Sequence, residues 1–183
     1  MLEAELKVSL AGLDAETVKD RAEALGFRLH RMVRETDAYY QGVNRDFRQT
    51  DEALRLRCCR LLPEGPEEIL LTYKGPKLDT ASCARVEYET AVADGEAARL
   101  LLEALGHRAA RIVDKMRREY VRAGVTLCLD EVTGLGWFLE LETLLPDESG
   151  REAAVTRLLE VLDRLGVSRE RLTRRSYLGL LEG

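Results

Sequence analysis

The sequence is poor in aromatic residues, histidine and cysteine, and each shortage narrows the chemistry it can support. Aromatic residues make up 5% of the 183 residues, so no aromatic-rich pocket for a nucleobase is evident. The two histidines each follow a short helical pattern, with no partner for a catalytic triad nearby, and are interpreted as surface residues: His30 and His107. The four cysteines lack the spacing of metal ligands and are predicted to be reduced, apolar fillers: Cys58, Cys59, Cys83 and Cys128.

The chain also lacks a long apolar run, a secretory signal and a block of basic residues. The first two absences argue against a membrane-spanning helix and against secretion. The 28 Lys and Arg and the 33 Asp and Glu are spread along the chain, with a net charge of −5. Without a basic patch, nucleic acid is not expected as the main partner. We therefore expect a cytoplasmic protein that needs neither membrane nor nucleic acid, folded as a single domain over residues 1–183.

Alternation of apolar and polar residues predicts eight strands, and three helical patterns lie between them. The strands are expected at 2–9, 28–40, 52–62, 67–75, 83–92, 108–122, 125–131 and 136–144. The helices are expected at 14–25, 94–105 and 150–165, each ending at a Leu-Gly pair. A further helical turn is expected after Ser168, and the tail 176–181 is expected to form a closing strand or a turn on the core.

A faint internal repeat links these elements. Three alternating strands contain Glu-x-Glu, and each is followed by a helix that ends in Leu-Gly. One interpretation is a set of pseudo-symmetric strand–helix units whose acidic faces converge. The alternative is that Leu-Gly is simply a common way to end a helix.

Like charges gather on the same face of the same strand. For one strand alone, a charged face is most simply a solvated surface. However, like charges on one strand face repel one another unless a charge of opposite sign compensates them. In addition, three amphipathic helices are available to cover the opposite, apolar faces of the strands. If the strands close into a barrel with these helices outside, the charged faces line its interior. The clearest pairs are Glu3 and Glu5, Arg55 and Arg57, Glu87 and Glu89, Lys115 and Arg117, and Glu140 and Glu142.

A charged interior calls for a highly charged ligand, and a polyphosphate with a metal ion fits the residue types. Arginine binds phosphate with a planar fork and lysine acts as a point charge, while clustered carboxylates suit Mg²⁺ or Mn²⁺. So many buried charges are tolerable only if ligand and metal complete the pairing. The predicted cations are Lys7, Arg55, Arg57, Lys74, Arg85, Lys115 and Arg117. The predicted carboxylates are Glu3, Glu5, Glu87, Glu89, Asp130, Glu140 and Glu142.

An ordered set of motifs along nearly the whole chain resembles the CYTH superfamily, the triphosphate tunnel metalloenzymes. The first motif, Glu3-Ala4-Glu5-Leu6-Lys7, is similar to the ExExK signature of that family. The later motifs are Asp37–Tyr40, Leu54–Arg57, Leu71–Pro76, Arg85–Glu89, Lys115–Arg117, Leu129–Val132, Leu135–Glu142 and Ser176–Leu178. Those at 72–76 and 135–142 are most similar to the branch of class IV adenylyl cyclases and thiamine triphosphatases.

The resemblance implies an α+β fold, a closed eight-stranded antiparallel β-barrel tunnel with helices packed on the outside. It implies Mg²⁺ or Mn²⁺ held by Glu3, Glu5, Asp130, Glu140 and Glu142. It implies that the triphosphate is gripped by Lys7, Arg55, Arg57, Lys74, Arg85, Lys115 and Arg117. Catalytic roles are expected for Lys7, Glu5 and Asp130, although the general base is not assigned. A homodimer is expected from family likeness only.

Three functions are consistent with these residues. The first is cyclisation of ATP to cyclic AMP and pyrophosphate, which the motifs favour slightly. The second is hydrolysis of inorganic tripolyphosphate, thiamine triphosphate or a nucleoside triphosphate by the same grip. The third is a non-catalytic module that binds polyphosphate, which the number of carboxylates argues against because a pure anion-binding site would not need them.

Overall fold

The computed structural model describes residues 2–78 and 85–183, in which eight strands alternate with helices. The strands are β1 (Leu2–Ser9), β2 (Arg28–Gln41), β3 (Ala53–Leu61), β4 (Glu67–Lys77), β5 (Arg85–Ala91), β6 (Arg108–Arg122), β7 (Val125–Val132) and β8 (Gly136–Leu145). The helices are α1 (Ala15–Ala24), α2 (Gly95–Ala104), α3 (Arg151–Arg164) and α4 (Tyr177–Glu182), with short 3₁₀ turns η1 (Glu148–Gly150) and η2 (Arg169–Arg171). Cys83 and the start of the strand predicted at 83–92 lie outside the described residues.

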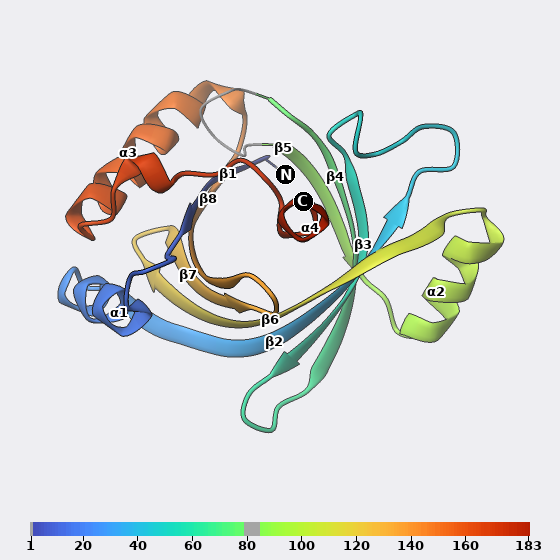
Figure 1. Ribbon diagram of the computed structural model, residues 1–183, viewed down its shortest axis with the longest axis horizontal. Coiled ribbons are helices and arrows are strands. Elements are labelled where there is room, and N and C mark those ends of the chain that lie inside the picture. Colours follow the sequence, from blue (N-terminus) through green and yellow to red (C-terminus); the bar gives the residue numbers. More distant parts are fainter. Residues whose placement is uncertain (1, 79–84) are drawn as a thin grey trace.

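The eight strands form a closed antiparallel barrel in the order β1-β5-β4-β3-β2-β6-β7-β8, which confirms the predicted fold class (Figure 1). The first strand closes the ring, because β1 pairs with β8 along its whole length and with β5 at Leu2 and Glu3. The long strands β2 and β6 pair with each other across the middle of the sheet. Because the sheet closes into a ring, each strand has one face toward the lumen and one toward the exterior.

The strand order confirms the repeat but limits it to two copies. The units β1-α1-β2-β3-β4 and β5-α2-β6-β7-β8 occupy equivalent places, since exchanging them leaves the circular order unchanged. The third Glu-x-Glu lies on β8, which ends the second unit and is equivalent to β4. Its resemblance to the start of a third unit therefore comes from the helix α3 that happens to follow it.

The helices begin and end where their capping residues predict. The side chain of Asp14 accepts hydrogen bonds from the backbone of Glu16 and Thr17, and Asp94 caps α2 in the same way at Ala97. The glycine of each Leu-Gly pair adopts a positive φ, for example +92° at Gly26, a conformation that L-residues rarely take.

The main apolar core lies outside the barrel, between the strands β1, β7 and β8 and the helices α1 and α3 (Figure 1). Leu6, Leu129 and Leu139 point outward from these strands and are at most 2% exposed. They pack in one cluster with Leu158 and Leu162 of α3. The predicted covering of apolar strand faces by helices thus holds on this side. On β2 and β6 the outer face is mixed. Arg34 there pairs with Asp114 at 3.1 Å, beside the exposed Met32 and Met116.

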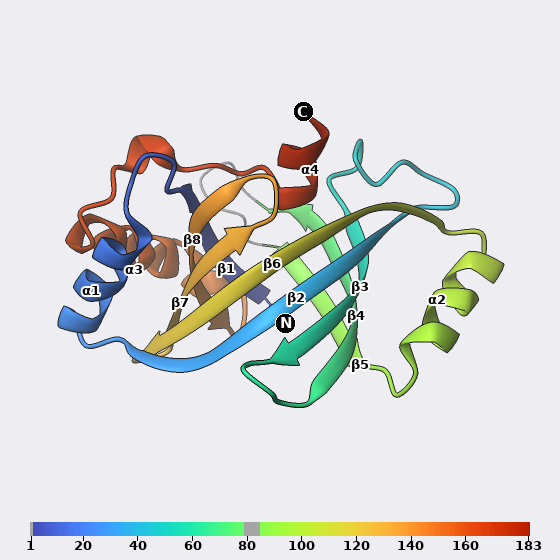
Figure 2. The same cartoon turned by 60° about the horizontal axis from the view of Figure 1, so that its bottom comes forward.

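The tail forms a helix rather than the closing strand that was one of the two expectations. Ser176 caps α4 by accepting a hydrogen bond from the backbone of Gly179 at 3.0 Å. In both views α4 lies across one end of the barrel (Figures 1 and 2). The alternative expectation, packing on the core, fits Tyr177, which is 5% exposed and clusters with Phe138 and Val113.

In the described part of the chain, no helix is both long enough and apolar enough to cross a membrane.

Candidate functional site

The lumen of the barrel is a charged cavity of about 960 Å³. Because side chains alternate along a strand, the charged faces recognised in the sequence all point inward. All seven predicted cations line this cavity: Lys7, Arg55, Arg57, Lys74, Arg85, Lys115 and Arg117. Six of the seven predicted carboxylates line it too: Glu3, Glu5, Glu87, Glu89, Glu140 and Glu142.

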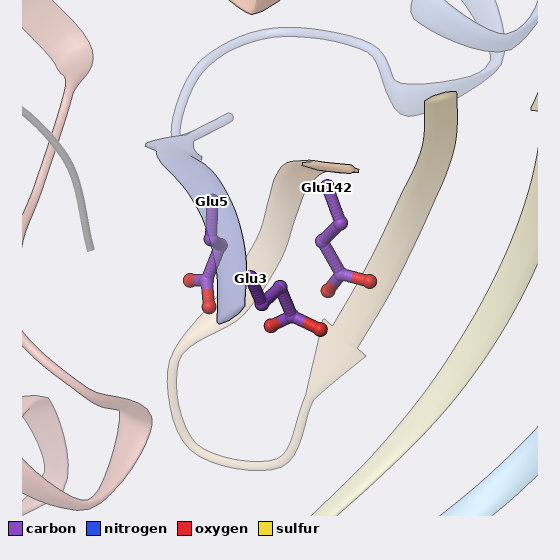
Figure 3. Close-up of side chains that lie close together, drawn as sticks. All are labelled: Glu3, Glu5 and Glu142. Atoms are coloured by element: carbon purple, nitrogen blue, oxygen red, sulfur yellow. The ribbon is translucent and has the colours of Figure 1, made fainter. Parts of the chain in front are cut away.

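Three of these carboxylates, Glu3, Glu5 and Glu142, converge at the seam between β1 and β8. Each offers one oxygen atom, and these atoms lie within 4.8 Å of one another. Figure 3 shows the three side chains reaching into the same space from the two strands. Register explains the cluster, because Glu5 and Glu142 are directly paired across the seam and Glu3 is two residues along on the same face. Three hard oxygen donors at this spacing fit a divalent cation.

The charge of the cluster is only partly compensated, because Lys7 contacts Glu5 at 3.1 Å and Arg117 reaches Glu142 at 3.4 Å, while Lys74 is 4.0 Å from Glu3. Burial raises the pKa of Glu142 well above its ordinary value, and neighbouring Glu3, Glu140 and Glu5 raise it further against the lowering effect of Arg117. Burial also raises the pKa of Glu3, in part offset by Lys74. A bound cation would supply the missing positive charge, so the donor set passes a chemical test for a metal site.

Glu140 lies beside the cluster but is already paired. Its carboxylate contacts Lys7 at 3.1 Å and also receives Arg117. Burial works to raise the pKa of Glu140, but Lys7, Arg117 and Lys115 together bring it well below its ordinary value. Glu140 therefore acts here as the partner of two tunnel cations.

Asp130 is not brought to the cluster of Glu3, Glu5 and Glu142, although the sequence predicted it as a ligand of the same metal. It is fully buried on β7 and does not line the cavity. It accepts hydrogen bonds from Lys115 at 2.9 Å, from two nitrogens of Arg117 at 2.7 Å each, and from the hydroxyl of Tyr177 at 2.9 Å. Both oxygens of Asp130 are thus engaged by protein donors, and its role in the fold is to hold the side chains of Lys115 and Arg117 in place.

Two lumen carboxylates that were not predicted as site residues, Glu35 and Asp37, play the same part on β2. Arg57 donates to both oxygens of Asp37, at 2.6 and 2.7 Å, and to Glu35 at 2.8 Å. Burial works to raise the pKa of Asp37, but Arg57 and Arg55 hold it below its ordinary value. The signal was available, because the two acids alternate on the lumen face of β2. The neighbouring Arg34 and Thr36 point to the other face of β2, and their polar side chains mask the alternation.

The cations consequently fall into two groups. Arg57 and Arg117 are held by carboxylates at hydrogen-bonding distance. Among the described residues, Arg55 makes three long ion pairs, 3.5 Å to Asp37, 3.8 Å to Glu87 and 4.0 Å to Glu89, and its buried Nε has no hydrogen-bond partner there. Within the described part of the chain, Arg85 donates a long hydrogen bond of 3.5 Å to the backbone carbonyl of Gly75. Arg55 and Arg85 both line the cavity and are held less closely by protein acceptors than Arg57 and Arg117, which suits them to contact a bound anion.

A closed barrel whose lumen combines a carboxylate cluster with a ring of arginines and lysines is a tunnel whose chemistry suits a polyanion together with a divalent cation. A family model described as the CYTH domain matches residues 1–177, and the chain belongs to this family. Membership implies use of a divalent cation. The family resemblance noted in the sequence is thereby confirmed.

Individual relatives extend this assignment. A Methanocaldococcus jannaschii protein, provisionally named adenylate cyclase, is 35% identical over 180 residues and covers 98% of both chains. The solved structure of the PH1819 protein from Pyrococcus horikoshii is 40% identical, with a TM-score of 0.89 over 98% of each chain. A structure of HpAC1 from Hippeastrum shares the fold at 17% identity, with a TM-score of 0.64 over 99% of this chain and 94% of its own. HpAC1 is provisionally named an adenylyl cyclase and described as having a dominant triphosphatase activity.

Proposed function

We propose that the protein is a metal-dependent enzyme that binds the triphosphate of ATP in its tunnel and forms cyclic AMP and pyrophosphate. The observation that carries the proposal is the presence, around one cavity, of a carboxylate cluster and seven cations. Such a pairing is needed to hold a polyanion together with its cation. The names of two curated relatives, at 35% and 27% identity, favour the cyclase among the possible reactions.

In this proposal Glu3, Glu5 and Glu142 hold Mg²⁺ or Mn²⁺. When bound, the cation would lower the pKa of the attacking group and neutralise charge on the phosphates. Arg55, with a spare buried donor, and Arg85 contact the phosphates directly. The engaged cations Arg57, Lys115 and Arg117 add a fixed positive field around them. Because these groups are pre-organised by their carboxylate partners, they stabilise developing charge without rearranging.

The reaction itself is an in-line attack at phosphorus. In the cyclase reaction the ribose 3′-hydroxyl forms a bond to the α-phosphorus, the bond from that phosphorus to the bridging oxygen breaks, and pyrophosphate leaves. The hydroxyl proton passes to a base. Lys7, which contacts Glu5 and Glu140 at 3.1 Å each, lies among the groups that can shuttle it.

Hydrolysis of a triphosphate is the second candidate, and the lining of the cavity favours it. Only two aromatic residues, Tyr39 and Tyr177, line the described part of the cavity, and both belong to the buried cluster at the α4 end. At the end of the tunnel opposite α4, the described lining therefore offers no aromatic ring on which an adenine could stack. Inorganic tripolyphosphate or thiamine triphosphate would need no such ring on the protein to hold its phosphates.

One set of incubations separates these reactions. The protein is mixed with Mg²⁺ or Mn²⁺ and either ATP or tripolyphosphate, and the products are identified by chromatography. Cyclic AMP with pyrophosphate supports the cyclase, whereas orthophosphate supports the hydrolase. Binding of both compounds without turnover would contradict both reactions and leave a polyphosphate-binding module.

A matched pair of variants controls the experiment. Glu5→Gln removes one carboxylate of the proposed metal cluster and is expected to lose metal-dependent turnover. Glu131→Gln makes the same change on the exposed face of β7 and is expected to behave as the wild type. Equal activity of both variants would contradict the metal assignment. Cytoplasmic localisation and a homodimer stay predictions from the sequence.

A further inference from the structure

Tyr177, the first residue of α4, connects the C-terminal helix to the charged lumen. Its ring lines the cavity, and its hydroxyl donates to Asp130 at 2.9 Å. The ring packs edge-on against Phe138, with centroids 5.1 Å apart. Tyr177 is therefore held from two sides, by a hydrogen bond and by an aromatic contact, and it is 5% exposed.

Two lysines from different strands lie over this one ring. The ammonium nitrogen of Lys7 on β1 is 4.6 Å from the ring centroid, and that of Lys115 on β6 is 5.1 Å away. Both distances are within the range of cation–π attraction, which strengthens where water is excluded. A lysine has a flexible four-carbon stem and holds no fixed direction by itself. A shared ring therefore restricts where both ammonium groups can sit.

Asp130 ties the ring to the same cations. It accepts from Tyr177 and also from Lys115 and Arg117, so one buried carboxylate links the helix to two cations of the tunnel. Lys115 thus contacts both the ring and the carboxylate that holds the ring. This closed set of contacts explains why Asp130 is buried behind the lumen instead of standing in the metal cluster.

We propose that Tyr177 is a positioning residue whose ring, held chiefly by its packing on Phe138, sets Lys7 and Lys115 at the α4 end of the tunnel. The helix α4 would then be part of the substrate grip, because it delivers the ring. The kinetic part of this inference rests on the proposed function, whereas the placement of the two lysines does not.

The placement is measured directly by NMR on protein labelled at the lysine ε-carbons. The chain has five lysines, so each ε-methylene signal can be assigned by a Lys→Arg change. Those of Lys7 and Lys115 are expected upfield of the signals of Lys19 and Lys77, since they lie over an aromatic face. Tyr177→Leu is expected to remove both upfield shifts, and Tyr177→Phe to keep them. Unshifted signals of Lys7 and Lys115 in the wild type would overturn the proposal even if Tyr177→Leu does not fold.

The functional consequence is measured with Mn²⁺ and whichever of ATP or tripolyphosphate the wild type turns over. A loss of one cation–π contact corresponds to about a tenfold effect, so Tyr177→Leu is expected to lower kcat/KM by about tenfold or more. The loss should fall mainly on kcat, because other cations still bind the phosphates. Tyr177→Phe, which keeps the ring, is expected to recover most of it. A purely structural role predicts instead that kcat/KM per folded molecule is unchanged in both variants, which would overturn the proposal.

The control is Tyr88→Leu, which removes a tyrosine ring that is 66% exposed. It is expected to change neither the lysine signals nor the kinetics. If the wild type turns over neither ATP nor tripolyphosphate, the proposed function fails, and the NMR comparison still decides the role of Tyr177. If the wild type is active and Tyr177→Leu matches it in kcat, KM and lysine signals, the inference alone fails.

Discussion

At the scale of single residues, the two groups of tunnel arginines should respond differently to truncation. Arg55 has a buried donor without a hydrogen-bond partner among the described residues, whereas Arg57 uses three nitrogens on Asp37 and Glu35. We expect Arg57→Ala to leave those buried carboxylates under-compensated and to cost about 3 kcal/mol of stability. Arg55→Ala should cost less, because Asp37 keeps Arg57, yet should weaken triphosphate binding more clearly per folded molecule.

Urea unfolding and calorimetric titration with tripolyphosphate, applied to both variants, check this difference. The exposed Arg34, which pairs with Asp114 on the outer face, supplies the control variant Arg34→Ala. It should change stability by less than about 1 kcal/mol and leave binding intact. Equal stability losses in Arg55→Ala and Arg57→Ala would contradict the division into two groups.

Glu142 provides a second residue-scale prediction. The pKa of Glu142 is raised well above its ordinary value, chiefly by burial. Keeping this carboxylate charged at neutral pH therefore costs folding stability. Glu142→Gln should therefore raise the melting temperature of the metal-free protein. One kcal/mol corresponds to about 2–4 °C for a chain of this size. In the wild type, Mn²⁺ at a hundredfold excess over its Kd should add about 5–10 °C.

The same variant should lose this gain from Mn²⁺, because one of three ligands is gone. Thermal melts with and without Mn²⁺ measure both effects. The control is Glu131→Gln on the outer face, which should keep the wild-type response. A Glu142→Gln protein that is less stable without metal and equally stabilised by Mn²⁺ would argue against a metal cluster at this seam.

Residues that line the lumen could be predicted from the sequence where polar and apolar residues alternate along a strand without interruption. Strands with uninterrupted alternation, such as the one that carries Glu140 and Glu142, showed their lumen residues directly. On β2 the outward Arg34 lies between inward residues and conceals Glu35 and Asp37. The pairing of Asp130 with Tyr177 joins residues 47 positions apart, and no local pattern encodes it.

At the scale of elements, the helix α3 should matter for stability and not for the site. Leu158 is fully buried between α3 and the outside of the barrel. We expect Leu158→Ala to cost about 2–5 kcal/mol, the usual range for such a cavity. Turnover per folded molecule should stay at the wild-type level, since the lumen lies on the other side of β1 and β8. Chemical unfolding and activity assays check both parts, and a changed KM at full folding would contradict this separation.

The bounds of most elements followed from the sequence to within one or two residues. Asp14 and Asp94 cap their helices as their positions predict, and glycines end them. The tail was harder, because Tyr177-Leu178-Gly179-Leu180 alternates in polarity too weakly to separate a strand from a short helix. Its helix is stabilised by the Ser176 cap and by burial of Tyr177 in the barrel, and the second of these is a tertiary contact.

At the scale of the whole molecule, the opposed pKa shifts in the lumen predict a non-monotonic dependence of stability on pH. Glu3 and Glu142 have raised pKa values, so protonating them as the pH falls from 8 stabilises the metal-free fold. Asp37 and Glu140 have lowered values, so their contribution is present above the unfolded pKa of about 4 and is lost below it. We expect maximal stability in mildly acidic solution.

Urea unfolding at a series of pH values in the presence of a chelator measures this profile. Glu142→Gln should flatten the rise on the alkaline side and keep the loss on the acidic side. Stability that only falls between pH 8 and pH 4 in the wild type would contradict the idea of a carboxylate cluster whose charge is only partly compensated.

The closed barrel was expected from sorted strand faces and from family likeness, but its circular order was not readable from local pattern. The order depends on which strands meet at the seam, and there β1 pairs with both β5 and β8. The pairing of β1 with β8 brings Glu3 and Glu5 to Glu142, which is 137 residues farther along the chain than Glu5. The metal cluster is therefore a product of closure, and an alternating strand alone could not specify it.

The central claim, a triphosphate and a divalent cation held together in this lumen, is tested most directly by a crystal structure. Crystals would be grown with Mn²⁺ and a non-hydrolysable ATP analogue, and the anomalous signal of manganese would locate the metal. The account predicts a manganese peak within coordinating distance of Glu3, Glu5 and Glu142, with phosphate oxygens against Arg55. A peak at Asp130 instead, or an analogue bound outside the barrel, would contradict it.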